Sequence, residues 1–171
     1  MKRYDVLRQC GVLPGILIVM TLLFAFSAAA QTPSIEGTYQ LISRTLPDGT
    51  MLKPPDIMGL CTYTKSHRNF NFVQKDATGK FLSGSSVSIY KLTATEYHET
   101  RLFSIVNDQI GGKDIIYDLS GETRSAPVTV EGGRIQFKSP FALRVFVFEG
   151  NRWTSTAENN ATAVDVWEKV Q

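Results

Sequence analysis

The sequence predicts an all-β protein, folded as an antiparallel sandwich or barrel. Short β-prone segments recur along the chain, and clusters of turn-forming residues separate them. Apolar and polar residues alternate within several of these segments, as expected where one strand face is buried. Downstream of residue 31 no long apolar period of the helical kind is present. The short hairpin connections argue against parallel βαβ units, which need long crossovers.

The strands are predicted from alternation and from the turns between them. Pro47 presets φ and Gly49 tolerates positive φ, so a turn ends the first strand there. Gly132-Gly133 is the clearest two-residue hairpin turn, and Pro140 ends the strand after it. The predicted strands are residues 35–46, 60–64, 69–73, 85–93, 95–107, 113–119, 127–131, 134–139, 141–148, 152–157 and 163–170.

Strict alternation assigns the residues of each strand to two faces. In the first strand Ile35, Gly37, Tyr39, Leu41 and Ser43 share a face, and Ile42 and Arg44 take the other. Phe70 and Phe72 share a face of the third strand. In the long strand of residues 95–107, one set is Tyr97, Glu99, Arg101, Phe103 and Ile105; the other is Glu96, His98, Thr100, Leu102, Ser104 and Val106.

Residues 1–30 are predicted to be a secretory signal. A basic start, Lys2, Arg3 and Arg8, precedes an apolar run over residues 12–26, and Ala28 and Ala30 have the Ala-x-Ala spacing of a cleavage site. We expect a mature domain of residues 31–171, exported to the periplasm or the extracellular space, with membrane contact only through the leader. An uncleaved anchor is the alternative, because the apolar run is almost long enough to span a bilayer.

Length, charge and cysteine content limit the class of protein further. The 171 residues suit one domain, and 43% hydrophobic with 20% charged residues is ordinary for a globular protein. Without the leader, 15 basic residues face 15 acidic ones, so no basic surface predicts nucleic-acid binding. Cys61 is then the only cysteine, which excludes an intramolecular disulfide and predicts a small buried hydrophobe.

Several segments together resemble the bacterial lipocalin-like domains of the calycin superfamily. Gly37-Thr38-Tyr39 resembles their Gly-x-Trp signature with Tyr39 in the tryptophan position, and Trp167 lies in a segment similar to their last strand. The resemblance implies an up-and-down antiparallel β-barrel of about eight strands that can hold one small ligand. It also implies that the first and last strands pair, with Tyr39 and Trp167 near each other or near the closed end.

A small, mostly apolar molecule is the ligand that such a barrel would bind. Ligand sites are mainly apolar with a few fixed polar groups, and the chain is rich in strand aromatics. The candidate ligand-binding residues are Tyr39, Tyr63, Phe70, Phe72, Tyr90, His98 and Arg101.

Two other functions remain open, an enzyme and an interaction protein. A barrel isomerase, cyclase or hydratase would have His98, Glu96, Glu99 and Arg101 as its polar cluster. A filled barrel would instead present an apolar patch from residues 141–148 to a protein partner. No catalytic motif is present, so no catalytic residue is assigned and an enzyme is the less favoured reading.

The sequence implies no cofactor and no metal. His67 and His98 are the only histidines, and their separation is not a zinc-ligand spacing. His67 is predicted in a solvated turn, and His98 in a barrel wall with a hydrogen-bond partner. Residues 160–162 match a glycosylation acceptor, which matters only in a eukaryotic secretory pathway.

Overall fold

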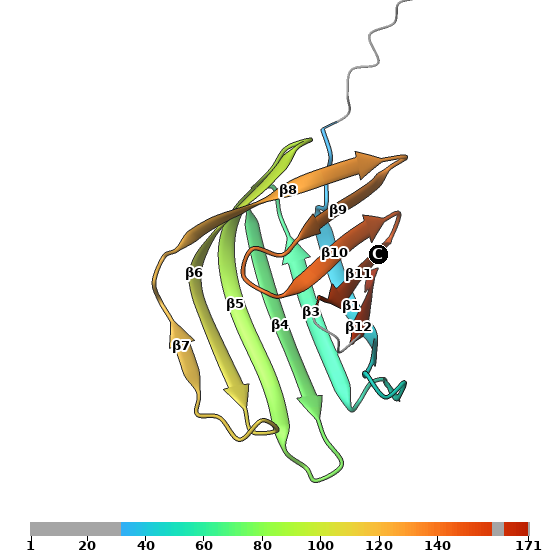
Figure 1. Ribbon diagram of the computed structural model, residues 1–171, viewed down its shortest axis with the longest axis vertical. Helices are drawn as coiled ribbons and strands as arrows, with labels where there is room; N and C mark the ends of the chain where they lie inside the picture. Colours follow the sequence, from blue (N-terminus) through green and yellow to red (C-terminus); the bar gives the residue numbers. More distant parts are fainter. Residues whose placement is uncertain (1–31, 159–162, 171) are drawn as a thin grey trace, which may run out of the picture. The chain divides into compact units, whose positions relative to one another are not determined.

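The computed structural model describes residues 32–158 and 163–170. It contains twelve strands and, over those residues, no helix (Figure 1). The predicted leader, Cys10 and the acceptor at residues 160–162 lie outside the described residues. No helix of the described part is long and apolar enough to cross a membrane. The strands are β1 (Gly37–Thr45), β2 (Met51–Leu52), β3 (Ile57–Tyr63), β4 (His67–Lys75), β5 (Phe81–Leu92), β6 (Glu96–Asp108), β7 (Ile116–Asp118), β8 (Thr123–Glu131), β9 (Arg134–Lys138), β10 (Arg144–Glu149), β11 (Arg152–Ala157) and β12 (Val164–Lys169).

Ten of these strands close into an antiparallel up-and-down barrel. Neighbours in the sheet follow chain order from β1 and β3 to β12, and β12 pairs back with β1 to close the ring. Leu41 lies opposite Trp167 in that closing pair, so the first and last strands meet as expected. The strand count of about eight was too low. β2 and β7 are additional short strands that pair with β1 and β6.

The walls of the barrel differ in height. β5 has 12 residues and β6 has 13, whereas β9 has 5 and β10, β11 and β12 have 6 each. At about 3.4 Å per residue the tall strands are roughly twice as long as the short ones. In Figure 1, β4, β5 and β6 accordingly extend well past β10. We call β4, β5 and β6 the tall wall and β9, β10, β11 and β12 the short strands. Part of the inner face of the tall wall therefore has no short strand opposite it.

Aromatic side chains fill the lumen where both walls are present. Stacked ring pairs run across the interior with centroid separations of 5.7, 4.3, 5.9, 5.4 and 4.7 Å. These rings come from β5, β6, β9, β10, β11 and β12, so one column joins both walls. Its members are Tyr90, Tyr97, Phe137, Phe148, Trp153 and Trp167.

Two bulges change the faces that strict alternation assigned. In β1 the register against β12 shifts between Leu41 and Ser43, so Arg44 rather than Ser43 shares the inner face with Asp165. In β6 the shift beside Leu102 returns Ser104 and Val106 to the inner face, opposite inward residues of β5. The assignments beyond these two points were wrong because a bulge inserts one residue and reverses every later side chain.

Two further local predictions are confirmed, and a third is wrong in part. Gly132 and Gly133 have φ of 57° and 84° and join β8 to β9 in a two-residue hairpin, as predicted. Cys61 is fully buried, as predicted for a small hydrophobe. The apolar strand predicted over residues 141–148 begins only at Arg144, and Phe141 lies in the preceding loop.

Candidate functional site

A cavity of about 250 Å³ lies inside the tall wall, beyond the aromatic column. Three phenylalanines, Phe70, Phe72 and Phe141, are among its apolar lining residues. Its polar surface comes from two arginines and several serine hydroxyls. The polar lining residues include Arg68, Arg101, Ser86, Ser104 and Ser139.

The strand register builds this cavity in layers across β4, β5 and β6. Phe70 lies opposite Ser86, which lies opposite Ser104. In the next layer Phe72 lies opposite Gly84, where a Cβ atom would come within 2.7 Å of the phenyl ring. Small residues on β5 and β6 therefore leave the space that the phenylalanines of β4 do not fill.

Arg68 is the innermost charged group of the cavity. Its Nε donates to the hydroxyl of Tyr63 at 3.1 Å, and Nη1 lies 3.4 Å from Glu99 Oε1 and 3.5 Å from Ser86 Oγ. Glu99 is almost fully buried and accepts a second bond from the Tyr97 hydroxyl at 3.1 Å. Among the described residues no hydrogen-bond partner is found for Arg68 Nη2. That group is available to a bound molecule.

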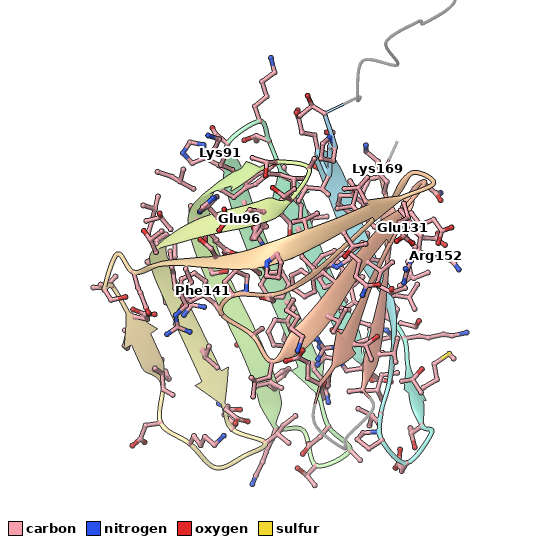
Figure 2. The ribbon with its side chains drawn as sticks, turned by 45° about the horizontal axis from the view of Figure 1, so that its top comes forward. Lys91, Glu96, Glu131, Phe141, Arg152 and Lys169 are labelled. Atoms are coloured by element: carbon pink, nitrogen blue, oxygen red, sulfur yellow. The ribbon has the colours of Figure 1, made fainter. Side chains whose placement is uncertain are left out.

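Arg101 and the loop of Phe141 border the cavity. Arg101 Nη1 donates to Asp118 at 2.9 Å, and its guanidinium lies 4.0 Å from the Phe141 ring centre. Arg124 approaches the same ring at 4.8 Å and donates to the Pro140 carbonyl at 3.3 Å. Phe141, labelled in Figure 2, is thus held between two guanidinium groups.

The carboxyl of Asp118 stays ionised over a wide pH range. Hydrogen bonds from the backbone and then the side chain of Ser120, followed by Arg101, lower the pKa of Asp118 to about 2. The Arg101–Asp118 pair therefore keeps its charges at neutral pH.

A second ionic cluster lies on the side of Phe72 nearer β12. Asp165 accepts a hydrogen bond from Arg44 Nε at 2.6 Å, and its other oxygen lies 3.1 Å from Arg144 Nη2. Arg44 also donates to Gln74 at 2.9 Å and lies over the Phe72 ring. The bulge in β1 brings Arg44 inward to meet Asp165. This cluster joins β1, β4, β10 and β12 and occupies interior space that a ligand would otherwise reach.

The predicted ligand-binding residues fall into three groups. Phe70, Phe72 and Arg101 line the cavity. The tyrosines are buried and pack against other aromatic rings in the filled part of the lumen, with Tyr39 5.7 Å from Phe148 and Tyr63 5.4 Å from Tyr90. His98 points to the outside of the wall. Four of the predicted residues therefore do not line the cavity: Tyr39, Tyr63, Tyr90 and His98.

The polar cluster considered for an enzyme is divided by the barrel wall. His98 and Glu96 are on the outer face, and Glu99 and Arg101 are on the inner face. The four side chains cannot meet around one substrate.

His98 nevertheless has the hydrogen-bond partners predicted for a wall residue. Its Nδ1 is 2.7 Å from Ser125 Oγ, and its Nε2 is 3.0 Å from Glu96 Oε2. A surface hollow of about 220 Å³ lies beside Glu96 and Ser125. The imidazole and carboxylate are 42% and 46% exposed, so water competes for both contacts. The arrangement supports the pairing of β6 with β8.

Residues that sequence reasoning missed complete the cavity. Arg68 lies between the strands predicted over residues 60–64 and 69–73, but it is in β4 and faces inward. Ser86 and Ser104 carry no local signal, since serine in a strand is ordinary on either face. Phe141 was assigned to a strand. Only its position between proline and a small residue could have indicated a loop.

A larger hollow of about 620 Å³ lies on the outer surface over β3 to β6. Outward side chains of these strands line it, among them Met58, Leu60, Val73 and Ile105. It is broad and open to solvent. The apolar patch expected from residues 141–148 is not formed, because Phe146 and Phe148 point into the core; Leu143 of that segment is 68% exposed.

Over the residues that the structure describes, no group of three or more metal-ligating side chains is found. Comparison of the chain with protein-family models, with curated proteins and with solved structures finds no match, so the lipocalin-like resemblance stays a prediction.

Proposed function

We propose that this protein is a lipocalin-like binding protein that holds a small, mostly apolar molecule in the cavity beyond the aromatic column. The observation that carries the proposal is the cavity itself, lined by phenylalanine rings with a few fixed polar groups. That combination is typical of ligand sites, whereas unused interior space is rare in a packed core.

The volume limits the size of the ligand. About 250 Å³ equals the liquid volume of roughly eight water molecules and lies just below the range of about 300–1,000 Å³ for small-molecule sites. Large lipids do not fit within it unless part of the molecule stays outside. The cavity is open on the side where the tall wall has no short strand opposite it, which provides a route of entry.

The lumen is favoured over the outer hollow for two reasons. Its polar groups converge from β4, β5 and β6 on one space, and its phenylalanines enclose that space on several sides. The outer hollow is wider and flatter, so it would bury a smaller share of a small ligand.

The first experiment is native mass spectrometry of the mature protein purified gently from its own compartment. A discrete additional mass that disappears on denaturation supports a bound ligand. A bare polypeptide mass in repeated preparations would count against a carrier and favour an interaction protein.

A matched pair of variants then locates the site. Ser104→Phe adds a ring to the lumen cavity, and Ser83→Phe adds the same ring to the outer hollow. We expect Ser104→Phe to abolish retention of the ligand and Ser83→Phe to leave it intact, with both variants folded by circular dichroism. The opposite pattern would place the ligand outside the barrel.

Export after removal of the leader near Ala30 belongs to the same proposal. The basic start, the apolar run and the small residues before Gln31 support it. Sequencing of the amino terminus of the exported protein tests it, and an amino terminus at Met1 contradicts it.

A further inference from the structure

We propose that the lumen cavity selects a ligand with an uncharged hydrogen-bond acceptor, such as an amide or ketone carbonyl, over the matching carboxylate or amine. This inference rests on the proposed function and specifies the polar group of the ligand. Three observations support it: the donors that face the cavity, the pairing of each lining arginine with a carboxylate, and the absence of a carboxylate from the cavity lining among the described residues.

The charged groups that line the cavity are donors only, and the serine hydroxyls beside them can donate as well as accept. Arg68 and Arg101 carry only N–H groups, and Nη2 of Arg68 has no partner among the described residues. The Ser86 hydroxyl, which accepts from Arg68 at 3.5 Å, can donate its own proton inward. A ligand that fits these groups must accept hydrogen bonds.

Each of the two arginines that line the cavity is already paired with a carboxylate. Arg68 faces Glu99 at 3.4 Å, and Arg101 faces Asp118 at 2.9 Å. Two guanidinium charges therefore meet two carboxylate charges before any ligand enters. A carboxylate ligand would add an unpaired negative charge to a largely apolar cavity, and its desolvation is costly. A neutral carbonyl uses the same donors without that cost.

An ammonium ligand is disfavoured for a different reason. Both oxygens of Glu99 are engaged, by Arg68 and by the Tyr97 hydroxyl, and neither Glu99 nor Asp118 lines the cavity. A cation would thus lie beside two guanidinium groups with no free carboxylate facing it.

Calorimetric titration with three probes of one chain length tests the inference. The probes are octanamide, octanoate and octylamine, which differ mainly in the charge of the head group. At neutral pH we expect octanamide to bind at least about tenfold more tightly than either charged probe. Repeating the titration with Ser104→Phe, which should lose all binding, shows that the measured binding is in the lumen.

A charge switch makes the test independent of the absolute affinities. Asp118→Asn keeps the shape of the side chain but leaves Arg101 uncompensated. We expect the ratio of octanoate to octanamide affinity to rise about tenfold in this variant. Asp76→Asn is the matched control, because Asp76 also accepts from the residue two positions later in a turn but lies away from the cavity. It should leave the ratio unchanged.

The outcomes separate the two proposals. Binding of octanoate or octylamine to the wild type as tightly as octanamide, or an unchanged ratio in Asp118→Asn, overturns the selectivity while ligand binding stands. Absence of binding by all three probes to ligand-free protein, together with a bare native mass, overturns the proposed function and the selectivity with it.

Discussion

The two halves of the lumen differ although β5 and β6 pass through both. Beside the short strands, Tyr90 stacks on Tyr97, Tyr97 stacks on Phe137 of β9, and the column continues through rings of β10, β11 and β12. Beyond those strands the inner residues of β5 and β6 are Ser86, Gly84 and Ser104, and the space beside them is open. The filled half carries the stability of the barrel, and the open half is free to bind a ligand.

The difference teaches that a barrel can separate stability from binding along its axis. Aromatic burial dominates where two walls face each other, since each ring buries a large apolar area. Small residues of β5 and β6 line the part where no short strand faces them, and the loop of Phe141 borders that space. Mutations in the two halves should therefore act on different properties.

Removal of a ring from the column should have the largest effect. Trp153 is almost fully buried and contacts Phe148 and Trp167. We expect Trp153→Ala to lower the free energy of unfolding by about 3–5 kcal/mol, measured by urea denaturation. Tyr117→Ala, at a position 65% exposed, is the control and should change it by no more than about 0.5 kcal/mol. Comparable losses of unfolding free energy in both variants would contradict the conclusion that the filled half carries the stability of the barrel.

The second largest effect should come from alkaline pH, which should destabilise the filled half. Burial raises the pKa of the Cys61 thiol from 9.0 to about 11, so the folded state favours the neutral thiol. This contribution is complete below about pH 9 and is lost as the pH rises to about 11, amounting to about 2–3 kcal/mol. Unfolding free energies measured across that range test it. In Cys61→Ala the fall over the same range should be smaller; an identical slope would exclude the thiol as its source.

A change in the loop of Phe141, which borders the open half, should have a smaller effect on stability. It should clearly raise the rate at which ligand dissociates. Phe141→Ala removes the ring held between Arg101 and Arg124, two contacts of about 0.5–1 kcal/mol each at an exposed site. We expect the free energy of unfolding to fall by about 1 kcal/mol and ligand to dissociate faster in stopped-flow measurements. Phe81→Ala, at a partly exposed ring outside the cavity lining, serves as the control and should leave the dissociation rate unchanged.

His98 should matter least, because it belongs to neither half of the lumen. Its side chain is on the outer face and contacts Ser125 and Glu96. We expect His98→Ala to leave ligand affinity unchanged and to alter the free energy of unfolding by no more than about 1 kcal/mol. A tenfold loss of affinity would show that the outer face takes part in binding.

Prediction from the sequence succeeded where structure depends on neighbouring residues. The Gly132-Gly133 hairpin, the shared face of Phe70 and Phe72 and the burial of Cys61 follow from turn chemistry and from alternation. Three lining residues of the cavity, Phe70, Phe72 and Arg101, are also among the candidates that the sequence offers. Arg68 was missed because the strand begins earlier than its turn-like composition indicates.

The sequence by itself determined the all-β class and the alternation of each strand, because both are local properties with a period of two residues. The tertiary structure decided the closure into ten strands, the two bulges and the place where the aromatic column ends. A bulge or a change in strand length depends on partners that are distant in the sequence, and a shift of one residue reverses every side chain after it. Local patterns therefore predicted the walls of the barrel, and long-range pairing determined which part of its interior was filled.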